Sequence, residues 1–176
     1  MGVSRLPVQQ ALLLLRNQGI LLDASGRGLL VAPLDSDHVR HMCDIRAVIE
    51  GLACRKAAET NSHQAKVKGP DLIRAGRKAL RNDSISEMIA ADIAFHRFIY
   101  SLSENPLVAP AMETHWTNTH RVMGEVLMRD EPPHEIWNQH EAMLEAIASG
   151  GEPQAEELAR LHISQVADLM IERLRQ

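Results

Sequence analysis

Asp92 and His96 are four positions apart in a stretch with helical periodicity, so their side chains would lie one turn apart on the same helix face. Phe95 and Ile99 continue that face, which predicts that it points into the protein interior. A buried carboxylate and imidazole need partners, because burying an unpaired charge is costly. Either they hydrogen-bond to each other and to a neighbour, or they bind a metal ion.

His140 and His162 have the same inward phase in two other segments. Apolar residues flank both at helical spacing, namely Met143, Leu144 and Ile147 around His140 and Leu158, Val166 and Leu169 around His162. A single inward histidine is usually a hydrogen-bonded core residue, but three of them with one aspartate are harder to explain that way. Neutral imidazoles with one carboxylate suit Zn²⁺, Ni²⁺ or Mn²⁺. The residues alone leave core packing and metal binding both open.

Two arginines, Arg46 and Arg121, fall within the apolar stripes of predicted helices. An inward arginine usually pairs with a buried carboxylate, and Glu50, one turn after Arg46, is the expected partner. The alternative is that one arginine holds a ligand carboxylate through two parallel hydrogen bonds beside the metal. His120, next to Arg121, either lines a cavity or packs at the surface or in the core.

The composition favours a helical protein of one domain, or one domain plus a fragment. The chain has 176 residues, of which 45% are hydrophobic and 3% aromatic. So few aromatic residues argue against a β-sandwich, and the apolar fraction argues against a disordered chain. No apolar run approaches the roughly 18 to 20 residues of a membrane helix, and the N-terminus does not read as a signal peptide. Cys43 and Cys54 are too far apart on one predicted helix for a disulfide, so we expect a cytoplasmic protein without a membrane partner.

The pattern along the chain predicts a small first part and a helical second part. Residues 4–18 carry the start and stop signals of a helix, and two short apolar runs around a glycine-rich turn predict a β-hairpin at 20–31. Residues 1–34 have a charge balance of +2 and the remainder −6, which hints that the first part meets an anion. After a linker, we expect six antiparallel helices at about 37–60, 70–81, 83–103, 105–129, 134–149 and 153–174.

Two groups of motifs resemble a known family of regulators. The run from Gly2 to Leu12 (Gly-Val-Ser-Arg-Leu-Pro-Val-Gln-Gln-Ala-Leu), with Gly19-Ile-Leu and Gly26-Arg-Gly-Leu-Leu-Val-Ala-Pro, resembles the end of a GntR-family winged helix-turn-helix. The rest resembles the FadR-like C-terminal (FCD) domain of the same regulators. Its marks are Ile45-Arg46 with Glu50-Gly51, Asp92-x-x-Phe-His96, Asn105-Pro106-Leu107, His140-x-x-Met-Leu-x-Ala-Ile147 and His162.

The resemblance implies an all-α fold: an antiparallel bundle of six to seven helices at residues 35–176. At residues 1–34 it implies a truncated winged helix-turn-helix, reduced to one helix and a hairpin. In that family the bundle senses a small molecule, often an organic acid, and many members hold a divalent metal with one Asp or Asn and three His. The metal ligands implied by the motifs are Asp92, His96, His140 and His162, with Zn²⁺ the first choice and Ni²⁺ or Mn²⁺ the alternatives. The residues that the helical phase suggests for effector binding are Arg46, Arg121 and His120.

The resemblance therefore implies a ligand-responsive transcriptional regulator, not an enzyme. A small carboxylate effector would complete the metal's coordination and reorient the DNA-binding heads of a homodimer on a palindromic operator. The implied DNA contacts are Arg5, Gln9, Arg27 and Gly28. Gln9 and Gln10 stand where the family usually has Arg-Glu, which removes a phosphate or guanine contact, although glutamine can pair with adenine. By this resemblance the chain begins inside the winged domain. Leu12, Leu14 and Leu15 would then lack the partners that normally pack against them, and operator binding would require a complete winged domain.

Two other classes of function stay open on the sequence. A metal-dependent enzyme could use an open coordination position to activate water, but no inward carboxylate stands out as a general base. Glu141, next to His140, would have to turn inward to serve, which its helical phase disfavours. A binding module without DNA contact is the third class.

Overall fold

The computed structural model describes residues 4–129 and 134–175. The chain divides into two compact units, with the boundary between Asp35 and Ser36. The gap expected between the helices at 105–129 and 134–149, and the first two residues of the N-terminal motif, Gly2 and Val3, lie outside the described residues. None of the described helices is long and apolar enough to cross a membrane.

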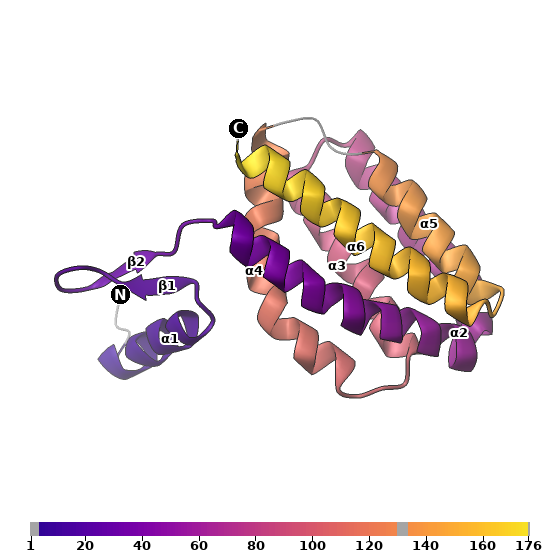
Figure 1. Cartoon of the computed structure of the whole chain (residues 1–176), viewed down its shortest axis with the longest axis horizontal. Coiled ribbons are helices and arrows are strands. Elements are labelled where there is room, and N and C mark those ends of the chain that lie inside the picture. Colours follow the sequence, from indigo (N-terminus) through magenta and orange to yellow (C-terminus); the bar gives the residue numbers. More distant parts are fainter. Residues whose placement is uncertain (1–3, 130–133, 176) are drawn as a thin grey trace. The chain divides into compact units, whose positions relative to one another are not determined.

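The first unit is a helix followed by a two-stranded hairpin, as predicted (Figure 1). Helix α1 (Arg5–Asn17) begins where the Ser4 hydroxyl accepts a hydrogen bond from the Leu6 N–H, at 3.4 Å. Strands β1 (Leu21–Asp23) and β2 (Leu29–Val31) pair antiparallel, with Leu22 opposite Leu30. None of the residues of α1 is buried.

The second unit is an all-helical bundle. Its helices are α2 (Ser36–Arg81), α3 (Ile85–Leu102), α4 (Val108–Arg129), α5 (Glu135–Ala148) and α6 (Glu152–Leu174). Helix α2 packs against α3, α5 and α6, and Figure 1 shows it running alongside α6. Fully buried alanines on α2, among them Ala53, Ala57 and Ala65, let the neighbouring helices approach closely.

Asn61 divides α2 into two segments, so that the bundle has the six helical segments that the sequence predicts. The Asn61 backbone leaves the helical region, with φ −138° and ψ 31°. Its side-chain amide donates to the Leu102 carbonyl at 2.9 Å and to the Glu104 carboxylate at 3.0 Å, and the Thr60 hydroxyl donates to the same carbonyl at 2.8 Å. These bonds fasten the kink to the end of α3.

The prediction that a new helix starts at Pro70 is wrong. The second segment of α2 starts directly after Asn61, and Pro70 lies inside it. Ala65, Gly69 and Ile73 fall on one face of this segment and are all buried. Burial of this stripe outweighs the hydrogen bond that proline removes and the weak local helix propensity.

Gly76 gives a test of how tightly the bundle is packed. A Cβ at this position would overlap the indole ring of Trp137, a buried side chain of α5. We expect Gly76→Ala to lower the free energy of unfolding by about 1–3 kcal/mol, because the ring must move or α2 must shift. The measurement is urea denaturation followed by circular dichroism.

Gly124→Ala on α4 is the matched control, since a Cβ there meets no described atom within 4 Å apart from its own helix backbone and chain neighbours. It should raise the free energy of unfolding by about 0.5–1 kcal/mol, because alanine favours the helix interior. Equal effects of the two substitutions would contradict the packing argument.

Candidate metal centre

Three helices bring four potential metal ligands together inside the bundle. Asp92 and His96 come from α3, His140 from α5 and His162 from α6, and all four side chains are buried. The i, i+4 spacing sets the first two on one face of α3, and the apolar neighbours of His140 and His162 turn those rings inward.

The distances between the ligand atoms fit a coordination shell. His140 Nε2 lies 3.2 Å from His162 Nε2, and Asp92 Oδ1 lies 3.7 Å from both His96 Nε2 and His140 Nε2. One ring nitrogen from each histidine lies within 4.8 Å of the others. Nitrogen and oxygen atoms about 2.1 Å from one ion would be roughly 3.0–3.4 Å apart. The three imidazoles are thus close enough to share one divalent ion after their side chains shift, and Asp92 lies beside two of them.

The rings of His96 and His162 are hydrogen-bonded through Nδ1, on the side away from the other ligands. Their Nε2 atoms are therefore left to face the metal position. His96 Nδ1 donates to Glu50 Oε2 at 2.5 Å, and His162 Nδ1 donates to the Gln139 side-chain oxygen at 2.7 Å. The Gln139 amide nitrogen in turn donates to Gln165 at 2.8 Å. Partners of this kind fix the tautomer and orientation of metal-binding imidazoles.

Aromatic packing positions the third ring, His140. Its ring stacks on Phe95 with 4.3 Å between centroids and meets the edge of Trp137 at 4.8 Å. Within the described residues, its Nδ1 has no hydrogen-bond partner. Aromatic packing thus orients the His140 ring on its Nδ1 side, while its Nε2 faces His162 and Asp92.

The electrostatics of the site keep two of the imidazoles neutral. Burial and the neighbouring imidazoles lower the pKa of His140 well below its usual value, and burial together with His96 lowers the pKa of His162 to about 3. Burial opposes the charged form of His96, but Glu50 and Asp92 outweigh it and raise its pKa. Burial raises the pKa of Asp92, partly offset by His96 and Arg46. Neutral His140 and His162 can offer their lone pairs to a metal.

A buried ion pair lies directly behind the site. Arg46 Nε donates to Glu50 Oε1 at 2.8 Å, as the sequence predicts, and both side chains are only 3% exposed. Arg46 Nη1 donates to the Thr119 hydroxyl at 3.4 Å, and the guanidinium lies 5.2 Å from the centre of the Trp116 ring. Burial opposes the ionised form of Glu50, but Arg46 and His96 outweigh it and hold the pKa of this carboxyl far below its usual value.

A cavity of about 70 Å³ is lined by three of the four potential ligands, Asp92, His96 and His162. Its polar end is formed by Arg46, Asp92, His96 and His162. The other lining side chains are apolar and come from all five helices, including Leu80, Met88, Val126, Trp137, Val166 and Met170. The arrangement can therefore take a small molecule with one polar end.

The remaining predicted site residues lie elsewhere. His120 and Arg121 of α4 are not among the side chains that line the cavity. The His120 ring lies 5.5 Å from Trp116, and Arg121 donates to the Asn118 side chain at 3.3 Å. Glu141 does not turn inward: its carboxylate accepts a hydrogen bond from Arg77 at 2.6 Å, so it does not reach the site as a base.

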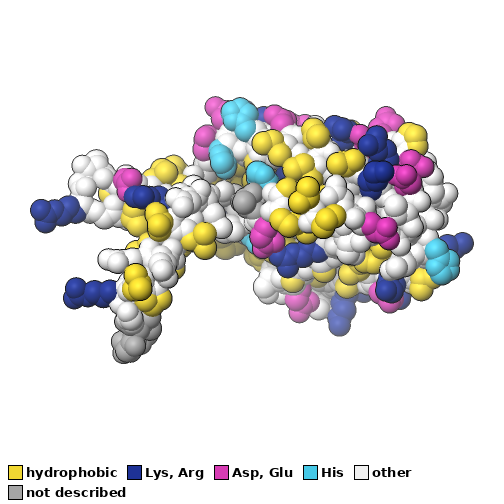
Figure 2. All heavy atoms as spheres, turned by 90° about the horizontal axis from the view of Figure 1, so that it is seen from below, with side chains coloured by type: hydrophobic (Ala, Val, Ile, Leu, Met, Phe, Trp, Pro, Cys, Tyr) yellow, Lys and Arg dark blue, Asp and Glu magenta, His cyan; other side chains and the backbone are white. Residues whose placement is uncertain are grey.

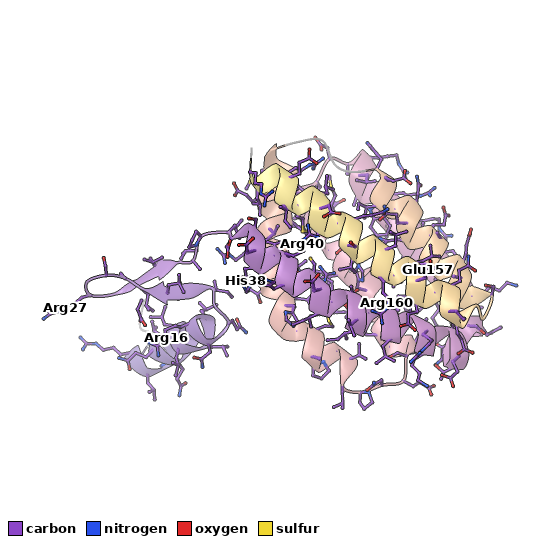
Figure 3. The ribbon with its side chains drawn as sticks, in the orientation of Figure 1. Arg16, Arg27, His38, Arg40, Glu157 and Arg160 are labelled. Atoms are coloured by element: carbon purple, nitrogen blue, oxygen red, sulfur yellow. The ribbon has the colours of Figure 1, made fainter. Side chains whose placement is uncertain are left out.

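The predicted DNA-contacting residues all lie in the first unit. Arg5 and Gln9 are exposed on α1, and Arg27 and Gly28 are exposed in the hairpin turn, where Figure 3 shows Arg27 at the tip. Figure 2 shows basic side chains projecting from this unit. Arg16 is instead paired with Asp23 at 3.3 Å.

Sequence reasoning missed two residues that orient the imidazoles. The sequence predicts Glu50 as the ion-pair partner of Arg46, but it does not predict the second hydrogen bond of Glu50, to His96. Gln139 was not singled out, because a polar residue beside an inward histidine carries no periodic signal. Its bond to His162 joins α5 to α6 and depends on how the two helices pack.

The sequence is similar to one protein family and to individual transcriptional regulators. The family model described as "FCD domain" matches residues 41–165. An HTH-type transcriptional regulator of an unstable DNA locus in Streptomyces ambofaciens is 29% identical, across 99% of this chain and 73% of that protein. The HTH-type transcriptional repressor RspR of Escherichia coli K12 is 22% identical, across 95% and 73%.

Two solved structures share the fold. Escherichia coli McbR/YncC superimposes with a TM-score of 0.84 at 19% identity, covering 97% of this chain and 82% of that one. A GntR family member from Pseudomonas syringae pv. tomato DC3000 has a TM-score of 0.60 at 19% identity, covering 99% and 73%.

The lowered pKa of His162 predicts a pH dependence of stability in the metal-free protein. Unfolded histidine has a pKa near 6.5, so the unfolded state binds more protons between about pH 6.5 and pH 3. Stability from this residue is thus present above pH 6.5 and is lost as the pH falls, by about 2 kcal/mol between pH 7 and pH 5. We expect His162→Gln, with chelator present, to reduce the loss measured by urea denaturation by about that amount.

His63→Gln is the control, since His63 is exposed on α2. It should leave the pH dependence as in the wild type. An unchanged pH dependence in His162→Gln would show that His162 is not held neutral in the folded protein.

Proposed function

The chain belongs to the FCD domain family, and on this basis we propose that it is a GntR-type transcriptional regulator that senses a small organic acid at a metal site. The proposal is carried by one observation: a carboxylate and three imidazoles from three helices converge at near-coordination distances beside a cavity. Binding of the acid would control DNA binding by the N-terminal unit.

The residues that would hold the ion are Asp92, His96, His140 and His162. Imidazole nitrogens with one carboxylate make Zn²⁺ the first choice, and Ni²⁺ or Mn²⁺ the alternatives. When bound, the ion supplies positive charge that attracts a carboxylate. Glu50 and Gln139 keep the protons on Nδ1 of His96 and His162, which leaves both Nε2 atoms as donors to the ion.

Arg46 is the proposed anchor for the effector. It lines the cavity, its Nε donates to Glu50 and its Nη1 donates to Thr119, and the proposal uses its other amino group, Nη2. That amino group can donate to a carboxylate at the polar end of the cavity. The effector-binding roles of His120 and Arg121 stay predictions from the sequence, because neither side chain lines this cavity.

The first unit is proposed to contact the operator through Arg5, Gln9, Arg27 and Gly28, with the arginines on phosphates or guanines. Such a regulator would work in the cytoplasm as a homodimer on a palindromic site. Ile45 and Val48, one turn apart on α2, are 50% and 54% exposed, and they supply apolar surface that a second copy could cover.

Metal analysis tests the site directly. After loading with Zn²⁺ and dialysis, the wild-type chain should retain about one equivalent of metal, measured by mass spectrometry of the elements. His162→Ala should retain far less, because it removes one ligand of four. His63→Ala, an exposed histidine of α2, should match the wild type. Equal metal content in wild type and a folded His162→Ala would refute the ligand assignment.

DNA binding tests the first unit. Duplexes are selected from genomic fragments with the chain alone and with the chain joined to any residues that the same reading frame encodes upstream. Light scattering gives the mass of the complex. Arg27→Ala should weaken binding and lower the salt slope by about one. Arg97→Ala, in an exposed ion pair with Glu113 of the bundle, should change neither. Failure to select any duplex at low salt in either form contradicts the proposal.

A further inference from the structure

We infer that the sensed acid is a short monocarboxylate whose carbon chain is apolar and carries no hydroxyl group. This inference rests on the proposed function and names its ligand class. It follows from three properties of the cavity: the charge at its polar end, the chemistry of its walls and its size.

The charge at the polar end suits one carboxylate. Arg46 contributes one positive charge, and Glu50 and Asp92 contribute two negative charges, so these buried side chains sum to −1. A divalent ion held by neutral imidazoles changes the sum to +1. One carboxylate cancels this charge, whereas a second would lie in the interior without a cation to pair with, which is costly.

The walls beyond the polar end are apolar. Val126 of α4 and Val166 of α6 are typical of the ten other side chains that line the cavity. Apart from the indole N–H of Trp137, these side chains offer no strong hydrogen bond. A hydroxyl group on the ligand would lose its hydrogen bonds to water on entering and gain little in return.

The volume of the cavity limits the length of the ligand's carbon chain. A cavity of about 70 Å³ is well below the roughly 300–1,000 Å³ of pockets that take drug-sized ligands. The ligand is therefore an acid with only a few carbons.

Three acids with four carbons each test the inference. The full chain, loaded with Zn²⁺, is titrated calorimetrically with butanoate, 3-hydroxybutanoate and butanedioate. Butanoate should bind about tenfold more tightly than either of the others, because a buried hydroxyl or carboxylate stays unpaired. If 3-hydroxybutanoate or butanedioate binds as tightly as butanoate, the inference is overturned, but the proposed acid sensor stands. If no acid binds to the metal-loaded chain, including longer and more polar ones, both are overturned.

Two matched variants assign the selectivity to the wall. Val126→Thr places a hydroxyl in the cavity with little change of volume, and it should reduce the preference for butanoate over 3-hydroxybutanoate several-fold. Val122→Thr is the control, because Val122 is equally buried one turn earlier on α4 but does not line the cavity. Both variants are checked for helicity and bound Zn²⁺. An equal change of selectivity in both would overturn the role of the apolar wall.

Discussion

The Glu50 carboxylate is the contact on which the rest of the site depends. It accepts hydrogen bonds from Arg46 and from His96 through different oxygens, at 2.8 and 2.5 Å, while being almost fully buried. A buried guanidinium without a counter-ion would be strongly destabilising, and an imidazole without this acceptor could turn or change its tautomer. One side chain therefore permits a cation at the edge of the cavity and orients a neighbouring imidazole.

The helices that carry these groups are arranged around α2. Its kink at Asn61 lets one long stretch of chain follow the bundle in two helical segments, each with its own buried residues. The first segment supplies Arg46 and Glu50 to the site. The second supplies Gly76, which makes room for Trp137, and Trp137 in turn touches His140 and lines the cavity. The packing of the bundle therefore also fixes the geometry of the site.

The sequence predicted the features that depend on spacing within one helix. Asp92 with His96 and Arg46 with Glu50 are i, i+4 pairs, and the inward phase of His140 and His162 follows from their apolar neighbours. The contacts of Glu50 with His96 and of Gln139 with His162 join different helices, so they depend on packing that periodicity does not encode. Pro70 was misjudged for the converse reason: local propensity favours a helix start there, but burial of Ala65, Gly69 and Ile73 carries the helix across it.

The orientation of the Gln139 side-chain amide affects the buried ring of His162. Its oxygen faces His162 and its nitrogen faces Gln165, a glutamine at the surface. If the amide turned over, its nitrogen would oppose the Nδ1–H of His162, and two donors would meet. The surface glutamine therefore helps to decide which nitrogen of a buried ring carries the proton. Water or a partner that competed for Gln165 would act on the buried ring through two hydrogen bonds, without entering the bundle.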